Sequence, residues 1–290
     1  MSAETRRFDD GHLAELRSLG AASAWVEGTV RLHALDYGGD RPPLVVLPGI
    51  TSPAVTWDFV VAELRDVVRP VVLDLRGRGL SDAAASYALD DYAGDVEATV
   101  HALGLDRPLL LGHSLGARIA AAVAVRGNVA LAGTIAIDPP LSGPGRGGYP
   151  TPRAAFVQQL AEGRAGTTAD AVARHYPAWP RAELALRARW LRTCDEAAVL
   201  ESHARFAEED FFAIWPDVPA PAAVIRGADS PVVTPADASD LTAANPAAPV
   251  VAVAGAGHMV PWDRRDEFIA ALRTLLAETF DIPPATLAAG

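Results

Sequence analysis

One short segment, Gly112-His-Ser-Leu-Gly116, has the spacing of a serine nucleophile. An apolar run over residues 109–111 precedes it, and an alanine-rich helical pattern over residues 115–125 follows it. A Gly-x-Ser-x-Gly sequence between a strand and a helix forms a sharp turn, because glycines lack the Cβ atoms that would collide there. The turn exposes the serine hydroxyl above the sheet, where the amino end of the helix directs its N–H groups and positive dipole. The segment therefore predicts nucleophilic catalysis by Ser114.

A nucleophilic serine needs a base, and the base needs a carboxylate to orient it. Among the seven histidines, His258 stands between the last apolar run, residues 250–253, and the last helical pattern, residues 263–279, so it is the predicted base. Two aspartates that follow apolar runs could orient it. Asp229 has the usual place of the acid in the order Ser, Asp, His, and Asp138 ends the run after the nucleophile's helix. Each could instead cap a turn beside Pro or Gly, so both stay open.

The negative charge that develops on an attacked carbonyl oxygen needs preset N–H donors. Leu115, the residue after the nucleophile, supplies one of them. The second is expected from Ile50, in the loop Leu47-Pro-Gly-Ile-Thr-Ser-Pro53 after the apolar run of residues 44–47. Gly49 allows the backbone to approach closely there. The sequence thus predicts an oxyanion hole formed by two backbone N–H groups.

The elements that must position these residues alternate between apolar runs and helical patterns. The predicted strands are residues 44–47, 71–75, 109–111, 134–137, 223–225 and 250–253, and an antiparallel hairpin of residues 24–28 and 30–37 precedes them. The predicted helices are residues 56–65, 91–103, 115–125, 235–244 and 263–279. Several runs are apolar at every position, as in strands covered on both faces. The alternation predicts an α/β fold with a mostly parallel central sheet and helices on both faces.

One region, residues 141–215, interrupts the alternation because it contains no convincing strand. It begins with a Pro/Gly-rich stretch and continues as several amphipathic helices. Such an insertion between two strands predicts a helical lid (cap) over the sheet edge where ligands bind, and an extra packing layer is the alternative. We expect a core of residues 1–140 and 216–290, with the lid between its two parts.

The composition limits the classes of partner. Among 290 residues, 25 Lys and Arg against 36 Asp and Glu give a net charge of −11, which disfavours nucleic acid and anionic membranes. The single cysteine, Cys194, excludes an internal disulfide framework and a multi-thiolate metal site. No secretory apolar segment follows the amino terminus, and no apolar run is long enough to span a bilayer. We expect a cytoplasmic protein with a small-molecule substrate and without a metal, an organic cofactor, nucleic acid or a membrane as partner.

A further segment, Asp74-Leu-Arg-Gly-Arg-Gly-Leu-Ser81, follows the second parallel strand. Together with the Ser114 turn and the His258 loop, it resembles the α/β-hydrolase superfamily, and the resemblance covers nearly the whole chain. The resemblance implies the α/β-hydrolase fold. One departure is Pro48-Gly49 at the oxyanion loop, where many members have His-Gly.

Within the superfamily, several segments resemble the N-formylmaleamate deformylases. They are residues 48–57, 76–81, 112–118, 138–140, 142–146, 149–150, 184–191, 193–194 and 256–263. The resemblance implies Ser114 as nucleophile, His258 as base and Asp138 as acid, in an acyl-enzyme mechanism on a small, carboxylate-bearing amide. The deformylases lack a counterpart of Asp229, so the chain departs from them at the usual position of the acid, and Asp229 stays the alternative.

The carboxylate of such a substrate needs a cation, and the planar fork of arginine suits it. The candidate substrate-binding residues are three arginines, Arg118, Arg146 and Arg192, and three aromatic residues that could line a pocket, Trp57, Tyr149 and Trp190. The same catalytic residues could serve a carboxylesterase or lactonase acting on neutral esters, or a carbon–carbon bond hydrolase. A ligand-binding protein without catalysis is the hypothesis from a different class.

Overall fold

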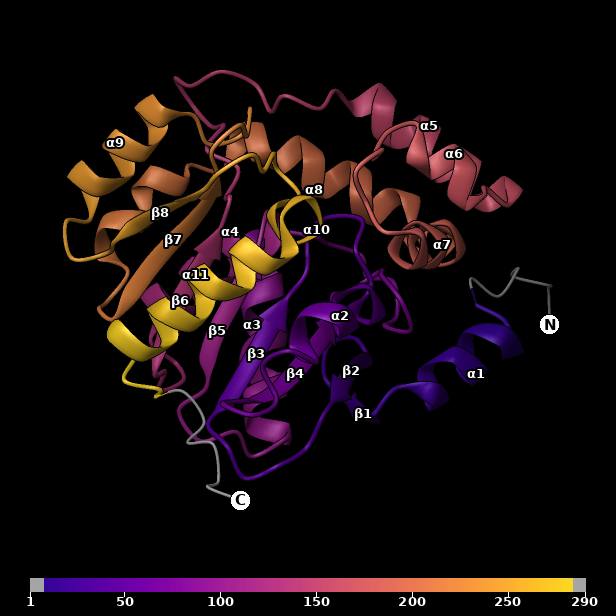
Figure 1. Ribbon diagram of the computed structural model, residues 1–290, viewed down its shortest axis with the longest axis horizontal. Coiled ribbons are helices and arrows are strands. Elements are labelled where there is room, and N and C mark those ends of the chain that lie inside the picture. Colours follow the sequence, from indigo (N-terminus) through magenta and orange to yellow (C-terminus); the bar gives the residue numbers. More distant parts are fainter. Residues whose placement is uncertain (1–7, 284–290) are drawn as a thin grey trace.

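The computed structural model describes residues 8–283, and an eight-stranded sheet forms its centre (Figure 1). The strands are β1 (Ala22–Val26), β2 (Leu32–Asp36), β3 (Pro43–Leu47), β4 (Arg69–Asp74), β5 (Leu109–His113), β6 (Gly133–Ile137), β7 (Ala222–Gly227) and β8 (Val250–Val253). Their order across the sheet is β1-β2-β4-β3-β5-β6-β7-β8. β1 and β2 pair antiparallel, and β3 to β8 pair parallel with one another. The predicted sheet, with an antiparallel hairpin at its start, is confirmed.

Helices cover both faces of this sheet. The helices of the core are α1 (Asp10–Ser18), α2 (Asp58–Val61), α3 (Leu89–Ala102), α4 (Leu115–Arg126), α9 (Pro235–Ala244), α10 (Val260–Asp263) and α11 (Arg265–Glu278). In the central strand β3, Leu44 and Val46 pack with α2 and α11, whereas Val45 and Leu47 pack with α3 and α4. Because alternate side chains of a strand point to opposite faces, a strand covered on both faces is apolar at every position. This packing explains the continuous apolar runs.

Two helical segments differ from the sequence-based prediction. The helix expected over residues 56–65 is divided into a 3-10 turn, η1 (Ala54–Trp57), and the single turn α2. All four residues of η1 are buried, so this stretch has no polar face with which to form a regular surface helix. Helix α1 was not predicted, and it begins with a capping box between Asp9 and His12.

Residues 141–215, which we call the inserted segment, lie between β6 and β7 and contain no strand. Their helices are α5 (Arg153–Ala165), α6 (Ala169–Ala173), α7 (Arg181–Trp190) and α8 (Glu196–Glu208). Figure 1 shows α5, α6 and α7 grouped at the upper right of the molecule, and α8 between this group and the core. The segment is therefore helical, and its role as a lid stays a prediction.

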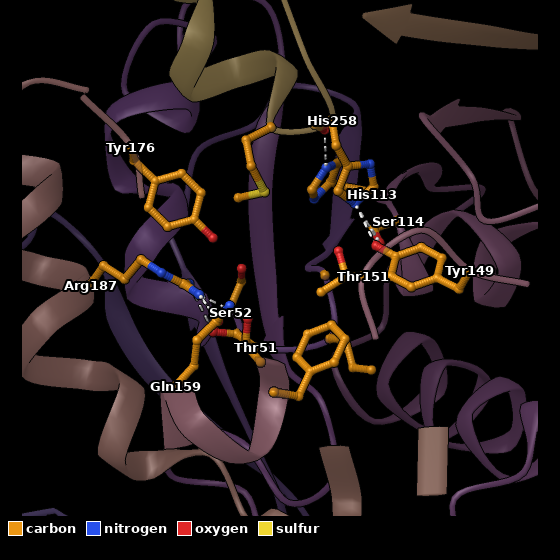
Figure 2. Close-up of a pocket in the computed structure, with 14 residues that line it drawn as sticks. Thr51, Ser52, His113, Ser114, Tyr149, Thr151, Gln159, Tyr176, Arg187 and His258 are labelled. Carbon is orange, nitrogen blue, oxygen red and sulfur yellow. Dashed lines mark hydrogen bonds between the residues drawn. The ribbon is translucent and has the colours of Figure 1, made fainter. Parts of the chain in front are cut away.

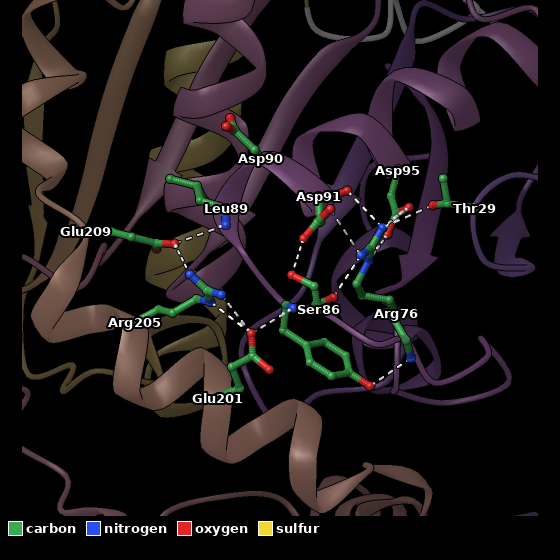
Figure 3. Close-up of polar contacts among 12 residues, drawn as sticks. Thr29, Arg76, Ser86, Leu89, Asp90, Asp91, Asp95, Glu201, Arg205 and Glu209 are labelled. Atoms are coloured by element: carbon green, nitrogen blue, oxygen red, sulfur yellow. Dashed lines mark hydrogen bonds and ion pairs between the residues drawn. The ribbon is translucent and has the colours of Figure 1, made fainter.

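Two carboxylates, one in α8 and one directly after it, attach this part of the inserted segment to the core (Figure 3). Glu201 accepts the Tyr87 N–H at 3.0 Å, and the Glu209 side chain accepts the Leu89 N–H at 3.1 Å. Leu89 is the first residue of α3, where the helix dipole favours a negative charge. Arg205 forms an ion pair with Glu201 at 2.9 Å. These contacts hold one end of the inserted segment on the start of α3.

Two features of other protein classes are missing from the part of the chain that the structure describes. None of the helices within residues 8–283 combines the length and the hydropathy needed to cross a membrane. In the same residues, no group of three or more His, Cys, Asp or Glu side chains is arranged to hold a metal ion.

Candidate active site

Ser114 connects β5 to α4 in a backbone conformation that is rare for a residue with a side chain, with φ 54° and ψ −118°. Two glycines make this turn possible. A Cβ at Gly112 would lie 2.1 Å from the Gly116 carbonyl oxygen, and a Cβ at Gly116 would lie 1.9 Å from the Leu47 carbonyl oxygen. Both distances are far inside van der Waals contact, so only glycine fits. The sharp turn predicted from the Gly-x-Ser-x-Gly spacing is present.

Replacing Gly116 with alanine is expected to lower the free energy of unfolding by about 2–3 kcal/mol, because the added methyl group must displace the backbone of the loop after β3. Urea denaturation measures this change. Gly94→Ala in α3 is the matched control, because a Cβ there meets nothing within 4 Å. A loss below about 0.5 kcal/mol for Gly116→Ala would contradict the close approach described above.

Ser114, His258 and Asp138 form one hydrogen-bonded chain. The Ser114 hydroxyl lies 3.1 Å from Nε2 of His258 (Figure 2), and Nδ1 of His258 lies 2.7 Å from Oδ2 of Asp138. The three residues follow β5, β8 and β6, whose carboxyl ends meet at one edge of the parallel sheet. Both contacts are within proton-transfer reach, so His258 can take the Ser114 proton while Asp138 holds the imidazole ring.

The carboxylate of Asp138 is fully buried and accepts two further hydrogen bonds. The Gly227 N–H donates to Oδ1 at 3.1 Å, and the Ser230 hydroxyl donates to Oδ2 at 2.6 Å. A buried carboxylate is stable only when donors surround it. These two donors, with His258, fix the carboxylate in the orientation that the imidazole needs.

Asp229 lies outside this hydrogen-bonded chain. The residue is exposed, and its backbone N–H donates to the Ala256 carbonyl oxygen at 2.9 Å. Within residues 8–283 its side chain forms no hydrogen bond or ion pair with His258. In the turn after β7, the Gly227 N–H and the Ser230 hydroxyl point to Asp138, whereas the Asp229 side chain lies in solvent. Of the two candidate acids, Asp138 and not Asp229 contacts His258 in the described part of the chain.

The two backbone groups expected to form the oxyanion hole lie beside Ser114. Neither the Ile50 N–H nor the Leu115 N–H donates a hydrogen bond to another group of the described chain. A Cβ at Gly49 would lie 3.5 Å from Cβ of Ser114, which shows how close the loop passes to the nucleophile. The arrangement supports the predicted oxyanion hole.

The segment of residues 74–81 holds the oxyanion loop from the other side. Oδ1 of Asp74 accepts the Ala54 N–H at 2.6 Å, and Nε of the fully buried Arg78 donates to the Ile50 carbonyl oxygen at 3.1 Å. Both contacts fix backbone groups of the loop. Residues 74–81 therefore position Ile50, whose backbone N–H is expected to donate the second hydrogen bond to the oxyanion.

His113 fixes the loop that carries His258. Its Nε2 donates to the His258 carbonyl oxygen at 2.9 Å. Burial, with a smaller contribution from His258, lowers the pKa of His113 to about 3, so the ring stays neutral. Trp57 packs on His113 with 6.0 Å between ring centroids and is fully buried. Trp57 supports the site from the core, and the prediction that it lines the substrate pocket is wrong.

A cavity of ≈160 Å³ lies in front of Ser114 and His258 (Figure 2). The loop of residues 49–52 lines one part of it. The inserted segment contributes Tyr149, Thr151, Phe156, Gln159, Tyr176 and Arg187. The cavity therefore lies between the carboxyl ends of the strands and the inserted segment, and its size suits a small molecule.

Arg187 brings a positive charge to this cavity. The residue is only 6% exposed, and Nη2 donates to the Thr51 hydroxyl and to Oε1 of Gln159, both at 3.2 Å. No Asp or Glu in the described part of the chain forms an ion pair with it. Figure 2 shows Arg187 on the wall opposite Ser114 and His258. Because a buried cation is costly without a counter-charge, this wall favours an anionic ligand.

Arg187 is not among the site residues predicted from the sequence, although the sequence contains a signal for it. Leu184, Arg187 and Ala188 share the buried face of α7, at the spacing of an apolar helical stripe. When an arginine takes an apolar position of such a stripe, its charged guanidinium is buried together with the rest of the side chain. That pattern distinguishes Arg187 from the arginines of exposed helix faces.

Arg118 clamps the inserted segment to the nucleophile's helix. Nη1 donates to the Pro140 and Ser142 carbonyl oxygens at 3.3 Å each, and Nη2 donates to the Glu209 carbonyl oxygen. Burial lowers the pKa of Arg118 to about 10, which leaves it charged at neutral pH. The prediction that Arg118 binds a substrate carboxylate is wrong, because the side chain is enclosed by backbone carbonyls.

The other two arginine candidates lie away from the cavity. Arg146 forms ion pairs with Asp237 and Asp240 at the surface, and its guanidinium stacks 3.7 Å from the centre of the Phe212 ring. Arg192 lines a separate cavity beside α1 and α5. Neither of them reaches the cavity at Ser114, so both predictions are wrong.

The two remaining aromatic candidates differ in position. Trp190 is buried, its indole N–H donates to the Glu15 carboxylate, and its ring packs 4.7 Å from the His12 ring, so it joins α7 to α1. The prediction that Trp190 lines the pocket is wrong. Tyr149 does line the cavity, with its hydroxyl 3.2 Å from Nε2 of His258.

The sequence matches the model of a known family over most of its length. Residues 44–271 match the model described as the alpha/beta hydrolase family. The chain belongs to this family. Three comparisons place this α/β hydrolase more closely within it.

This α/β hydrolase is 40% identical to the N-formylmaleamate deformylase of Pseudomonas putida over 249 residues, which are 85% of the chain and 93% of the relative. It is 29% identical to the 2-(acetamidomethylene)succinate hydrolase of Mesorhizobium japonicum, over 80% of the chain and 87% of that relative. A solved N-formylmaleamic acid deformylase from Pseudomonas putida superposes with a TM-score of 0.81 at 34% identity, covering 87% of this chain and 99% of the other. The predicted resemblance is confirmed.

Proposed function

We propose that this α/β hydrolase cleaves a small amide that carries a carboxylate, and that its substrate resembles N-formylmaleamate. The observation that carries the proposal is the presence of the Ser114–His258 pair and the Arg187 cation in one small cavity. Two relatives support this substrate class, since one is named for N-formylmaleamate and the other for an acetamidomethylene succinate. Both names describe an N-acyl group on a compound with a carboxylate.

Catalysis begins when Ser114 attacks the acyl carbon and Nε2 of His258 takes its proton. Asp138 stabilises the imidazolium that forms. The oxygen of the attacked carbonyl becomes negative and accepts hydrogen bonds from the Ile50 and Leu115 N–H groups. The C–N bond then breaks, His258 returns the proton to the leaving nitrogen, and the acyl group stays on Ser114. Water, deprotonated by the same ring, releases the acid, which is formate for a formyl substrate.

Arg187 binds the substrate carboxylate in this proposal. The net charge of −11 repels an anion at a distance, but salt screens that repulsion over about 8 Å at physiological ionic strength. The local charge on the cavity wall is then decisive. Thr51 and Gln159 hold the guanidinium in place, so its planar N–H groups are preset for a carboxylate.

The experiment that tests the function compares kcat/KM for N-formylmaleamate, a neutral N-formyl amide and p-nitrophenyl acetate. We expect N-formylmaleamate to exceed the neutral amide by about a hundredfold, because only the anion satisfies the buried cation. A fluorophosphonate probe should modify Ser114, which mass spectrometry of the labelled peptide detects.

Each rival function gives a different result in this experiment. Preference for p-nitrophenyl acetate would indicate a carboxylesterase or lactonase. The absorbance change of a dienolic ring-cleavage product would indicate a carbon–carbon bond hydrolase. A folded protein that neither labels nor turns over any substrate would be a ligand-binding protein.

The proposal also covers the division of the chain into core and lid and the cellular location of the protein. Residues 141–215 act as a lid on a core of residues 1–140 and 216–290, which is supported by the six cavity-lining residues that this segment contributes. A cytoplasmic location is supported by the single cysteine, Cys194, which is buried.

A further inference from the structure

Tyr149 places a hydroxyl group beside the reacting atoms. Its oxygen lies 3.2 Å from Nε2 of His258, and the Ser114 hydroxyl lies 3.1 Å from the same nitrogen (Figure 2). Ser114 and Thr151 line the same cavity as this hydroxyl. Burial raises the pKa of Tyr149, so the phenol keeps its proton at neutral pH.

The Ser–His–Asp chain does not need this hydroxyl during attack. With the Nδ1–H donated to Asp138, Nε2 of His258 has one lone pair, and Ser114 must use it when it loses its proton. The next step is different, because the protonated Nε2 then delivers its proton to the leaving atom. That atom must lie about 3 Å from Nε2. The Tyr149 oxygen is 3.2 Å from the same nitrogen, so it lies close to the leaving atom.

An amide leaving group has a requirement that an ester leaving group lacks. The amide nitrogen must turn its lone pair to His258 to be protonated, and its N–H then points in another direction. In a closed cavity, an N–H without an acceptor costs free energy. An ester oxygen carries no hydrogen, so it needs no such acceptor.

We propose that the Tyr149 hydroxyl oxygen accepts a hydrogen bond from the N–H of the leaving nitrogen while the tetrahedral intermediate collapses. In this step the C–N bond breaks, its electron pair goes to nitrogen, His258 supplies the proton, and the C=O bond re-forms. Tyr149 transfers no proton and offers only a lone pair. It is thus a catalytic residue for amides and not for esters. This inference rests on the proposed function.

Tyr149→Phe tests the inference, because it removes only the hydroxyl. N-formylmaleamate and p-nitrophenyl formate leave the same formyl group on Ser114, so a difference between them arises in acylation. For N-formylmaleamate we expect kcat to fall about tenfold or more, with KM within about threefold of wild type. For p-nitrophenyl formate we expect kcat/KM to fall by less than about threefold.

Tyr176→Phe is the matched control, since it removes a hydroxyl beside Arg187 on the opposite wall. Its effect on N-formylmaleamate should appear in KM and not in kcat. Equal losses of Tyr149→Phe on both substrates would mean that Tyr149 only positions Ser114 and His258, and would overturn the inference alone. A wild-type enzyme that hydrolyses the ester but not the amide would overturn the proposed function as well.

Discussion

Asp138→Asn is expected to lower kcat for N-formylmaleamate about 10³- to 10⁴-fold, as loss of the carboxylate does in a serine protease. Asparagine keeps the shape of the side chain, but it removes the charge that stabilises the imidazolium of His258. Its amide group also allows the wrong tautomer of the ring. Steady-state kinetics with the purified variant, together with thermal unfolding, separates this loss from a loss of folded protein.

Asp229→Asn is the control for this variant, because it removes the same charge from a neighbouring turn. The Asp229 residue is exposed, so kcat should stay within about twofold of wild type. Should Asp229→Asn cause the larger loss, the hydrogen-bonded chain from Asp138 to Ser114 would not be the path that activates the nucleophile. Near-silent changes at both positions would contradict the mechanism as a whole.

Arg187→Met is expected to lower kcat/KM for N-formylmaleamate about 10²- to 10³-fold, mainly through KM. Methionine keeps much of the apolar stem but provides neither the charge nor the N–H groups that a carboxylate needs. For p-nitrophenyl acetate, which is neutral, the loss should be below about threefold. The ratio of the two losses measures how far the cavity wall selects an anion.

Arg146→Met is the matched control, since Arg146 also lies in the inserted segment but is paired with Asp237 and Asp240 at the surface. We expect it to change kcat/KM for either substrate by less than about twofold. Arg187 also donates to Thr51, the residue after Ile50, so it has a structural role as well. Equal losses of Arg187→Met on the neutral ester and the anionic amide would show that this structural role is the main one.

Local patterns were sufficient to predict much of the fold and part of the site. Strands covered on both faces must be apolar at every position, so the runs that became β3 to β7 could be recognised directly in the sequence. The turn at Ser114 depends on glycines that are its near neighbours in the chain. The loop of His258 was identified from its place between the last strand and the last helix. For such features, the residues that cause the structure lie within a few positions of it.

The choice between Asp138 and Asp229 could not be made in this way. Both residues follow strands of the same sheet, and both stand beside turn-forming residues. They differ because the Gly227 N–H and the Ser230 hydroxyl donate hydrogen bonds to the Asp138 carboxylate. These donors lie about ninety positions further along the chain. No local pattern encodes that contact.

The amino-acid sequence alone therefore determined the strands, the nucleophile's turn and the predicted base, because short-range sterics and the alternation of side chains govern these features. The burial and pairing of individual charges were decided by packing. Arg118 is enclosed by carbonyls from both ends of the inserted segment, whereas Arg187, with no carboxylate partner in the described chain, faces the cavity. An arginine's role depends on what long-range folding places around its guanidinium, and that information is absent from the residues beside it.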